Sequence, residues 1–242
     1  MTSSTEDKRP IIRLKNIGLA YSIRAGFRNR SEVWALKDIS FDLFKGDSLG
    51  VIGGNGMGKT TLLKVLAGII SPDRGVIEAT GCQTTLLSLA LGFAPNLSGR
   101  ENILLSGMMM GLDRQVIEGK MEGIIEFSEL GESIDRPVST YSSGMKLRLG
   151  FAVAIEAEGD VLLIDEVLGV GDKAFQAKSS KVLHEMIQSD RTVVIVSHSV
   201  ATIRSLCDRV VWIHQGESIC AGDTESILAR FEEESAGRTA KR

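Results

Sequence analysis

The sequence predicts an α/β fold, with a parallel sheet whose faces are covered by helices and an inserted helical segment. Three observations predict it. Short apolar runs alternate with helical patterns in the last third of the chain, as parallel strands with covered faces do. A glycine-dense turn joins a strand to a helix within 48–70, and apolar residues recur at helical spacing from about 98 to 157. With 242 residues, 43% of them apolar, the chain can bury a core in one large or two modest domains.

The first predicted elements are strands. Residues 11–17 and 36–43 are short, partly alternating runs of Ile, Leu and Phe, which is typical of strands with one buried face. Residues 22–31 between them contain glycine and arginines and predict a loop or hairpin tip. Residues 48–53 predict a strand that leads through the glycine turn into a helix ending near 71–75.

Helical patterns fill the segment 98–157, with turns at Gly111 and near Pro137. After it, strands and helices alternate. The strands are predicted at 161–165, 192–197 and 209–213, and the helices at 173–188 and 199–206. The last eight residues, SAGRTAKR, are expected to fray.

Composition excludes several classes of protein. With 28 basic and 31 acidic residues the net charge is −3, which gives no field to hold a polyanion, so we expect no nucleic-acid partner. No apolar run reaches the ~18 residues of a membrane span, and we expect a soluble or peripheral protein. Cysteines 82, 207 and 220 are far apart and lack a CxxC pair, which favours a reducing compartment and neither a disulfide framework nor a zinc site.

Residues 53–60, GGNGMGKT, fit the pattern G-x-x-x-x-G-K-[ST] between a predicted strand and helix. Glycines there let backbone N–H groups curl around phosphate oxygens at the positive end of the helix. Lys59 would neutralise the β and γ oxygens, and Thr60 would offer its hydroxyl to Mg²⁺. An ordinary glycine turn is the alternative. The expected nucleotide-binding residues are Gly53, Asn55, Gly56, Gly58, Lys59, Thr60 and Thr61.

Two carboxylates follow the apolar run at 161–164. An open α/β sheet binds its ligand at the carboxyl ends of its strands. Asp165 would therefore hold Mg²⁺, directly or through water, and Glu166 would orient and polarise the water that attacks the γ-phosphate. This string alone favours a strand end with solvated acids, but its occurrence beside a phosphate loop favours the metal and water roles.

His198 and Ser142 are further candidates. His198 follows the run 192–197, where an imidazole can donate to the γ-phosphate, although a structural histidine is the simpler interpretation of that residue alone. Ser142 is placed as the N-cap of a helix, and a helix start with small residues is also an anion site.

With these motifs in this order, the chain resembles the nucleotide-binding subunit of ATP-binding-cassette (ABC) transporters over about residues 11–225. Residues 53–61 resemble the Walker A loop, YSSGM at 141–145 the signature usually written LSGGQ, 161–166 Walker B, Gly171-Asp172 the D-loop and His198 the switch histidine. The resemblance implies a P-loop NTPase fold with a mixed sheet core, an antiparallel β subdomain and an inserted α-helical subdomain. The implied divisions are a RecA-like core with the β subdomain at about 11–97 and 158–222, a helical signature subdomain at about 98–157, and a C-terminal helix and tail at 223–242.

The resemblance also implies partners. Two copies would pair head to tail, so that Ser142 and Gly144 of one close over the γ-phosphate bound by the other. ATP and Mg²⁺ would be the cofactors. The helical segment would receive a cytoplasmic helix of a separate membrane permease, placing the chain peripherally at the cytoplasmic face of the inner membrane.

Three strings narrow the resemblance. YSSGM, LGFAPNLSGREN at 91–102 and DEVLGVGD at 165–172 look like ATPase subunits that export lipid-linked polysaccharides such as O-antigen, capsule or teichoic acid. The alternatives are a transporter for another cargo, such as a lipid, drug or peptide, and a soluble cassette ATPase of DNA repair or translation. Repair ATPases carry a long coiled coil and translation factors carry two cassettes, and neither fits this length.

The chain departs from the family pattern in two places. Where the family has a Mg²⁺-contacting glutamine, this chain aligns best at Ser88, and Gln83 is close but misplaced. The aromatic residue expected to stack on adenine is Tyr21, with Phe27 and Trp34 as alternatives.

Two side-chain groups have open interpretations. The arginines at 24, 28 and 30 form either a solvated face or a contact to anionic lipid or a pyrophosphate-linked headgroup. The run Met108–Met110 is expected to pack in the core rather than to form a pliable groove.

Overall fold

The computed structural model describes residues 9–24, 30–87, 93–156, 158–165, 172–189 and 191–239. The sequence-based predictions for Phe27, Arg28, Ser88, Glu166 and Gly171 lie outside these residues. Of Arg24 and Arg30 the structure describes the backbone alone.

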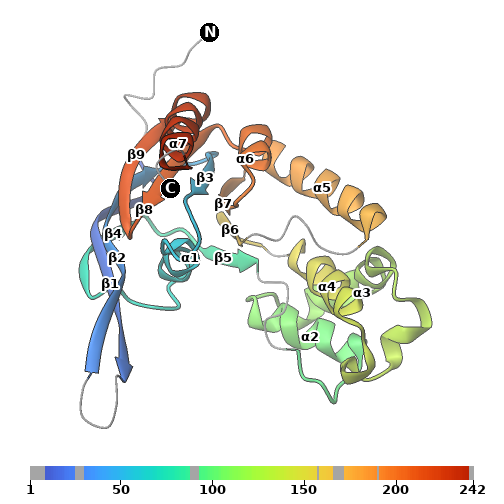
Figure 1. Ribbon diagram of the computed structural model, residues 1–242. Coiled ribbons are helices and arrows are strands. Elements are labelled where there is room, and N and C mark those ends of the chain that lie inside the picture. The colour runs from blue at the N-terminus through green and yellow to red at the C-terminus, as the bar shows by residue number, and fades with distance from the viewer. Residues whose placement is uncertain are drawn as a thin grey trace.

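In the described residues, nine strands form one sheet in the order β4-β1-β2-β9-β8-β3-β7-β6-β5 (Figure 1). Strands β8, β3, β7, β6 and β5 pair in parallel, whereas β4, β1 and β2 pair antiparallel. The mixed α/β sheet predicted from the sequence is therefore confirmed. The strands are β1 (Ile12–Arg24), β2 (Arg30–Leu43), β3 (Ser48–Ile52), β4 (Arg74–Ala79), β5 (Thr84–Leu87), β6 (Val161–Asp165), β7 (Thr192–Val196), β8 (Arg209–His214) and β9 (Glu217–Asp223).

The helices fall into two groups. In Figure 1, α2, α3 and α4 lie together beyond β5, and α5 reaches from the sheet toward them. The helices of the described residues are α1 (Lys59–Leu66), α2 (Gly99–Met109), α3 (Arg114–Ser128), α4 (Ser143–Ala154), α5 (Lys173–Gln188), α6 (Val200–Leu206) and α7 (Thr224–Thr239), with short 3₁₀ turns η2 (Gly131–Asp135) and η3 (Val138–Thr140).

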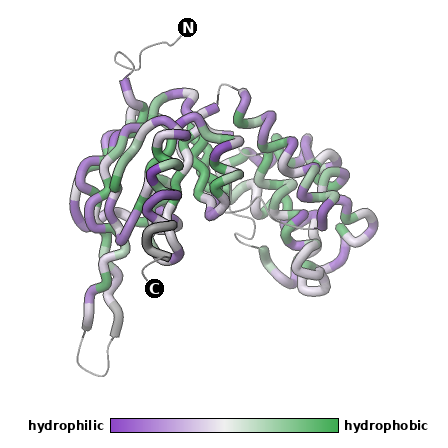
Figure 2. The backbone as a smooth tube through the Cα atoms, turned by 45° about the horizontal axis from the view of Figure 1, so that its top comes forward, coloured by the Kyte–Doolittle hydropathy of each residue, from purple (hydrophilic) through white to green (hydrophobic). Residues whose placement is uncertain are grey.

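Burial explains why the central strands have near-continuous apolar sequences. Every residue of β3 and β7 is buried, as expected for parallel strands with covered faces. The helical group has its own apolar core, which includes Ile103, Ile117 and Leu149. Figure 2 shows both apolar regions, one along the central strands and one inside the helical group.

Several elements differ from the predictions. Strands β1 and β2 extend beyond 11–17 and 36–43, because the two strands continue to pair from Tyr21↔Val33 to Arg24↔Arg30. The sequence did not predict this part because no apolar alternation marks a buried face there. Strands β4, β5 and β9 were not predicted, since β4 is mostly exposed and β5 has only four residues. The prediction that the last eight residues fray is wrong for most of them, because helix α7 continues to Thr239.

The methionine run is the other correction. Met108 and Met109 are 53% and 58% exposed, so the predicted core packing is wrong for both. They lie in the last turn of α2, outside the set of buried residues on that helix, which are Gly99, Asn102, Ile103, Ser106 and Gly107. Met110 does pack against the apolar cores. In the part of the chain that the structure describes, no helix has the length and apolar character needed to cross a bilayer.

Candidate nucleotide site

The glycine loop lies between the carboxyl end of β3 and the first turn of α1. Its last glycine, Gly58, is the N-cap of α1 with φ +97°, a backbone conformation that side chains disfavour. A Cβ at this position would also overlap the carbonyl oxygen of Ala35. Glycine at position 58 is therefore required by both the turn and the close approach of β2.

Lys59 is 6% exposed and ties the loop together. Its Nζ donates to the carbonyl oxygens of Gly53 at 2.8 Å and Gly54 at 2.9 Å, and it lies 3.4 Å from Nδ1 of His198. His198 follows β7, the neighbour of β3 in the sheet. The fold thus brings together Lys59 and His198, which the sequence analysis predicted to follow two separate strands.

Asp165 reaches the same edge from β6, the next strand. Its Oδ1 lies 3.5 Å from Oγ1 of Thr60 in the first turn of α1. A hydroxyl and a carboxylate oxygen that face each other are ligands suited to Mg²⁺. The donor set therefore fits the metal predicted for these two residues.

A cavity of about 380 Å³ opens over this edge of the sheet. Such a space, next to a positive helix end and a lysine, suits a polyphosphate. It is lined by Ala35, Asn55, Gly56, Met57, Gly58, Lys59, Thr60, Thr61, Val196 and His198.

Two exposed aromatic side chains, Tyr21 and Trp34, lie on the paired strands β1 and β2. The hydroxyl of Tyr21, a residue 39% exposed, lies 3.5 Å from Oγ1 of Thr61. Trp34 is similarly exposed, but the guanidinium of Arg74 lies over its ring, 4.5 Å from the centroid. Tyr21 thus contacts a residue that lines the cavity, whereas Trp34 packs against Arg74.

Ser142 and Gly144 lie elsewhere in the chain. Ser142 is the N-cap of α4, as predicted, and its Oγ accepts from the backbone N–H of Met145 at 3.2 Å. Neither residue lines the cavity over the glycine loop, and α4 stands apart from α1 in Figure 1. The chain by itself does not bring these two residues to its own loop.

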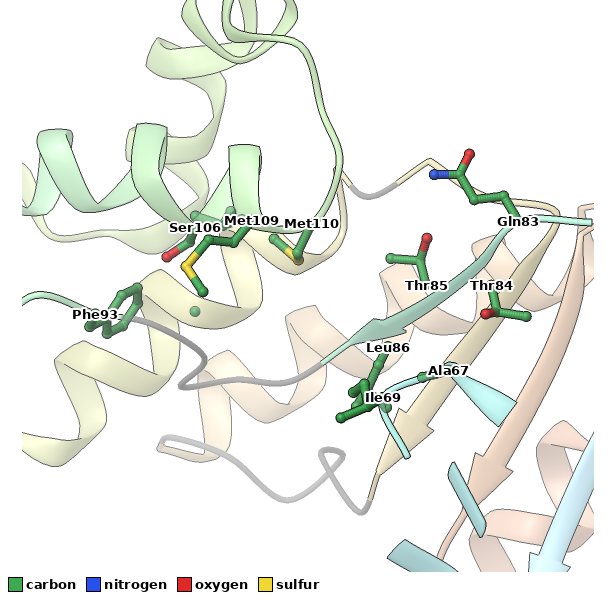
Figure 3. A pocket seen from close by; sticks show the side chains of 12 residues that line it. Ala67, Ile69, Gln83, Thr84, Thr85, Leu86, Phe93, Ser106, Met109 and Met110 are labelled. Atoms are coloured by element: carbon green, nitrogen blue, oxygen red, sulfur yellow. The ribbon is translucent and has the colours of Figure 1, made fainter. Parts of the chain in front are cut away.

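Sequence reasoning missed a second cavity, of about 280 Å³, between the edge strand β5 and the helical group. Figure 3 shows Phe93, Met109 and Met110 on its helical side and Gln83 and Leu86 on the strand side. The side chains come from segments far apart in the sequence, so no local motif marks the cavity. Gln83 therefore belongs to this junction, and Ser88 falls outside the described residues.

Asp172 lies at the start of α5. Its Oδ1 accepts from the backbone N–H of Phe175 at 2.9 Å, and that bond lowers the pKa of the carboxyl, with a smaller contribution from the charge of Arg148. The side chain is therefore an ionised N-cap at neutral pH.

Fold and site together define a phosphate-loop nucleotide-binding protein, and the comparisons name its family. The family model described as ABC transporter matches residues 36–169, more than half of the chain. The chain therefore belongs to the ABC transporter ATP-binding family, whose members are ATPases.

Particular relatives are similar over most of this chain. It is 45% identical over 199 residues to the O-antigen export system ATP-binding protein RfbB of Klebsiella pneumoniae, covering 82% of this chain and 81% of the relative. It is 44% identical over 210 residues to the teichoic acids export ATP-binding protein TagH of Lactococcus lactis, covering 87% of this chain. The match spans only 45% of that TagH.

Solved structures share the fold. An ATP-binding cassette, MJ0796, in a dimeric post-hydrolysis state with ADP and Pi aligns with a TM-score of 0.73 at 18% identity, over 88% of this chain and 98% of the other. The ATP-binding subunit of an ABC transporter also aligns at 0.73, with 21% identity, over 92% of this chain and 93% of the other. At these identities the alignments establish the fold alone.

Proposed function

We propose that the chain is the ATP-hydrolysing motor subunit of an ABC transporter that exports a lipid-linked cell-surface polysaccharide of the O-antigen, capsule or teichoic acid type. The observation that carries the ATPase part is the convergence of Lys59, His198 and Asp165 at the ends of three neighbouring strands. The cargo rests on the names of the relatives that are 44–45% identical. The alternatives are transport of another cargo and, with less support, a soluble ABC ATPase.

Each residue would have a distinct task. Lys59 neutralises phosphate oxygens, with the loop N–H groups and the start of α1 around them. His198 donates toward the γ-phosphate and Glu166, next in sequence to Asp165, holds the attacking water. Thr60 and Asp165 would hold Mg²⁺, and the ion would supply positive charge that stabilises the phosphates.

The proposed site is shared between two copies. Ser142 and Gly144 stand away from the glycine loop of their own chain, as a head-to-tail ATP sandwich would require. We expect Ser142→Ala to weaken ATP-dependent dimerisation more than nucleotide binding by the single chain. Sedimentation with ATP measures the first, and a fluorescent ATP analogue measures the second. Equal losses in both would contradict the shared site.

The permease would dock at the cavity between β5 and the helical group. The exposed Met109 lines it, and flexible thioethers pack well against a partner helix. Docking there would hold the chain peripherally at the cytoplasmic face of the inner membrane.

The test of the whole proposal uses Glu166→Gln. This variant should bind ATP, dimerise and hydrolyse very slowly, and wild-type turnover would show that the base is another residue. Co-purification of a membrane partner separates a transporter motor from a soluble ATPase. Loss of surface polysaccharide on deletion of the coding sequence, restored by the wild-type chain and not by Glu166→Gln, separates this cargo from a lipid, drug or peptide.

A further inference from the structure

Three phenylalanines meet where the helical group joins the sheet core. Phe127 comes from α3, Phe151 from α4 and Phe175 from α5, and their ring centroids lie 5.8 to 5.9 Å apart. Phe151 and Phe175 are buried. Phe127 packs against both the core of the sheet and that of the helical group. This aromatic joint therefore connects the two apolar cores, at the end of α5 that Figure 1 shows beside α3 and α4.

Charged side chains cover the aromatic joint. Lys178 on α5 donates to the carbonyl oxygen of Phe127 at 3.0 Å and to Oε1 of Glu129 at 2.8 Å, and its Nζ lies 4.4 Å from the ring centroid of Phe127. Arg148 on α4 lies 3.6 Å from Oε2 of Glu129. One carboxylate thus bridges a cation on α4 to a cation on α5.

The backbone of Glu129 is also unusual. It is the C-cap of α3 with φ +56°, in the left-handed region where glycine or asparagine is normally found. A glutamate there has a conformational cost that its neighbours must offset. In this structure the carboxylate of Glu129 contacts Arg148 and Lys178.

The aromatic joint lies between two segments of the candidate site. Helix α4 begins at the N-cap Ser142, and Arg148 lies further along the same helix. Helix α5 begins at the N-cap Asp172, and Phe175 lies in its first turn. The two helices flank β6 in the chain and also contact each other through side chains at the aromatic joint.

We propose that the aromatic joint and the Glu129 bridge fix the orientation of α4 against α5 in the ATP-bound pair, and that Glu129 is a positioning residue that sets Ser142 for the ATP sandwich. The inference rests on the proposed function, because it assumes that Ser142 closes over a nucleotide held by a second copy. It adds residues to the machinery that touch neither nucleotide nor metal.

The test compares Glu129→Gly with wild type, both in the Glu166→Gln background. Glycine removes the bridge and also relieves the left-handed backbone, so the melting temperature should stay within about 2 °C of the parent. Affinity of the single chain for a fluorescent ATP analogue should be unchanged. The dissociation constant of the ATP-bound dimer should rise about fivefold or more. Lys178→Met should raise the dissociation constant of the dimer as Glu129→Gly does. Lys178→Arg should leave it close to that of the parent.

The matched control is Glu118→Gln, which breaks the exposed ion pair with Arg114 on α3 and should leave dimerisation unchanged. Unchanged dimerisation in Glu129→Gly would overturn the positioning role alone. Weaker dimerisation accompanied by a lower melting temperature would also overturn it, because the variant would then be unstable rather than mispositioned. If the parent chain itself binds ATP but does not dimerise, the proposed function fails with it.

Discussion

At the scale of single residues, two buried polar side chains each hold a loop through several hydrogen bonds, one at the nucleotide site and one in the helical group. Lys59 joins two loop carbonyls and lies beside His198. Asn102 is fully buried and holds the turn before α2: its Oδ1 accepts from Ala94 N, and its Nδ2 lies within 2.8 to 3.1 Å of the carbonyl oxygens of Ala94, Leu97 and Ser98. Neither side chain can be replaced without leaving backbone groups unmatched.

Lys59→Ala should lower the affinity for ATP about ten- to hundredfold, because a charge-assisted contact of about 1.5–3 kcal/mol is lost. Titration with a fluorescent ATP analogue measures it. Lys64→Ala, in the last turn of the same helix, is the control. An equal loss in that variant would mean that α1 as a whole, rather than the Lys59 ammonium, governs binding.

Asn102→Asp should destabilise the chain by about 3 kcal/mol, since a buried carboxylate would face three carbonyl oxygens without N–H groups to donate. Urea unfolding followed by circular dichroism gives the change. Asn96→Asp, at an exposed position of the same turn, should change little. A comparable loss there would mean that charge in the turn, not the buried bonds, is responsible.

At the scale of elements, helix ends and glycines decide how the helical group is built. Helix α2 starts with a capping box in which Ser98 and Glu101 bond each other's backbone, and this bonding lowers the pKa of Glu101. Helix α3 contains two exposed glycines, Gly119 and Gly123, with open space where a side chain would be. Gly107 in α2 differs, because a Cβ there would lie 2.7 Å from Cδ1 of Ile117.

Gly119→Ala and Gly123→Ala should each stabilise the chain by about 0.5–1 kcal/mol, since alanine loses less backbone entropy in a helix. The midpoint of thermal unfolding should rise. Gly107→Ala should instead lower it, because α2 and α3 would be pushed apart. A rise in all three variants would contradict the close packing of α2 on α3.

At the scale of the whole molecule, stability depends on pH through groups buried between elements. Burial between α6 and the sheet raises the pKa of the Cys207 thiol from 9.0 to about 12. The unfolded chain releases this proton near pH 9.0, whereas the folded chain keeps it until about pH 12. The thiol contribution is thus complete below pH 9.0 and declines as the pH rises toward 12.

The free energy of unfolding, measured with urea between about pH 8 and pH 11, should therefore fall less steeply with pH in Cys207→Ala than in wild type. Comparing slopes removes the constant cost of the cavity that alanine leaves. Identical slopes for wild type and Cys207→Ala would show that the thiol is exposed to solvent.

The sequence predicted the structure best where a local residue pattern is compatible with one structure only. Strand ends in a parallel sheet share an edge, so Lys59, Asp165 and His198 could be brought together from motifs alone. Pairing and packing between distant segments could not be predicted. The β1–β2 hairpin depends on cross-strand partners, and the Met109 surface depends on where α2 ends relative to β5. The left-handed Glu129 has no sequence signal, since glutamate is a good helix former.

The separation of α4 from the glycine loop within one chain has a kinetic consequence under the proposed function. When catalysis needs the Ser142 end of one copy and the Lys59 end of another, a dilute preparation contains mostly half-assembled sites. Specific activity would then climb with protein concentration and level off once encounters between copies are no longer limiting. Anchoring two copies side by side on a permease would abolish that concentration dependence.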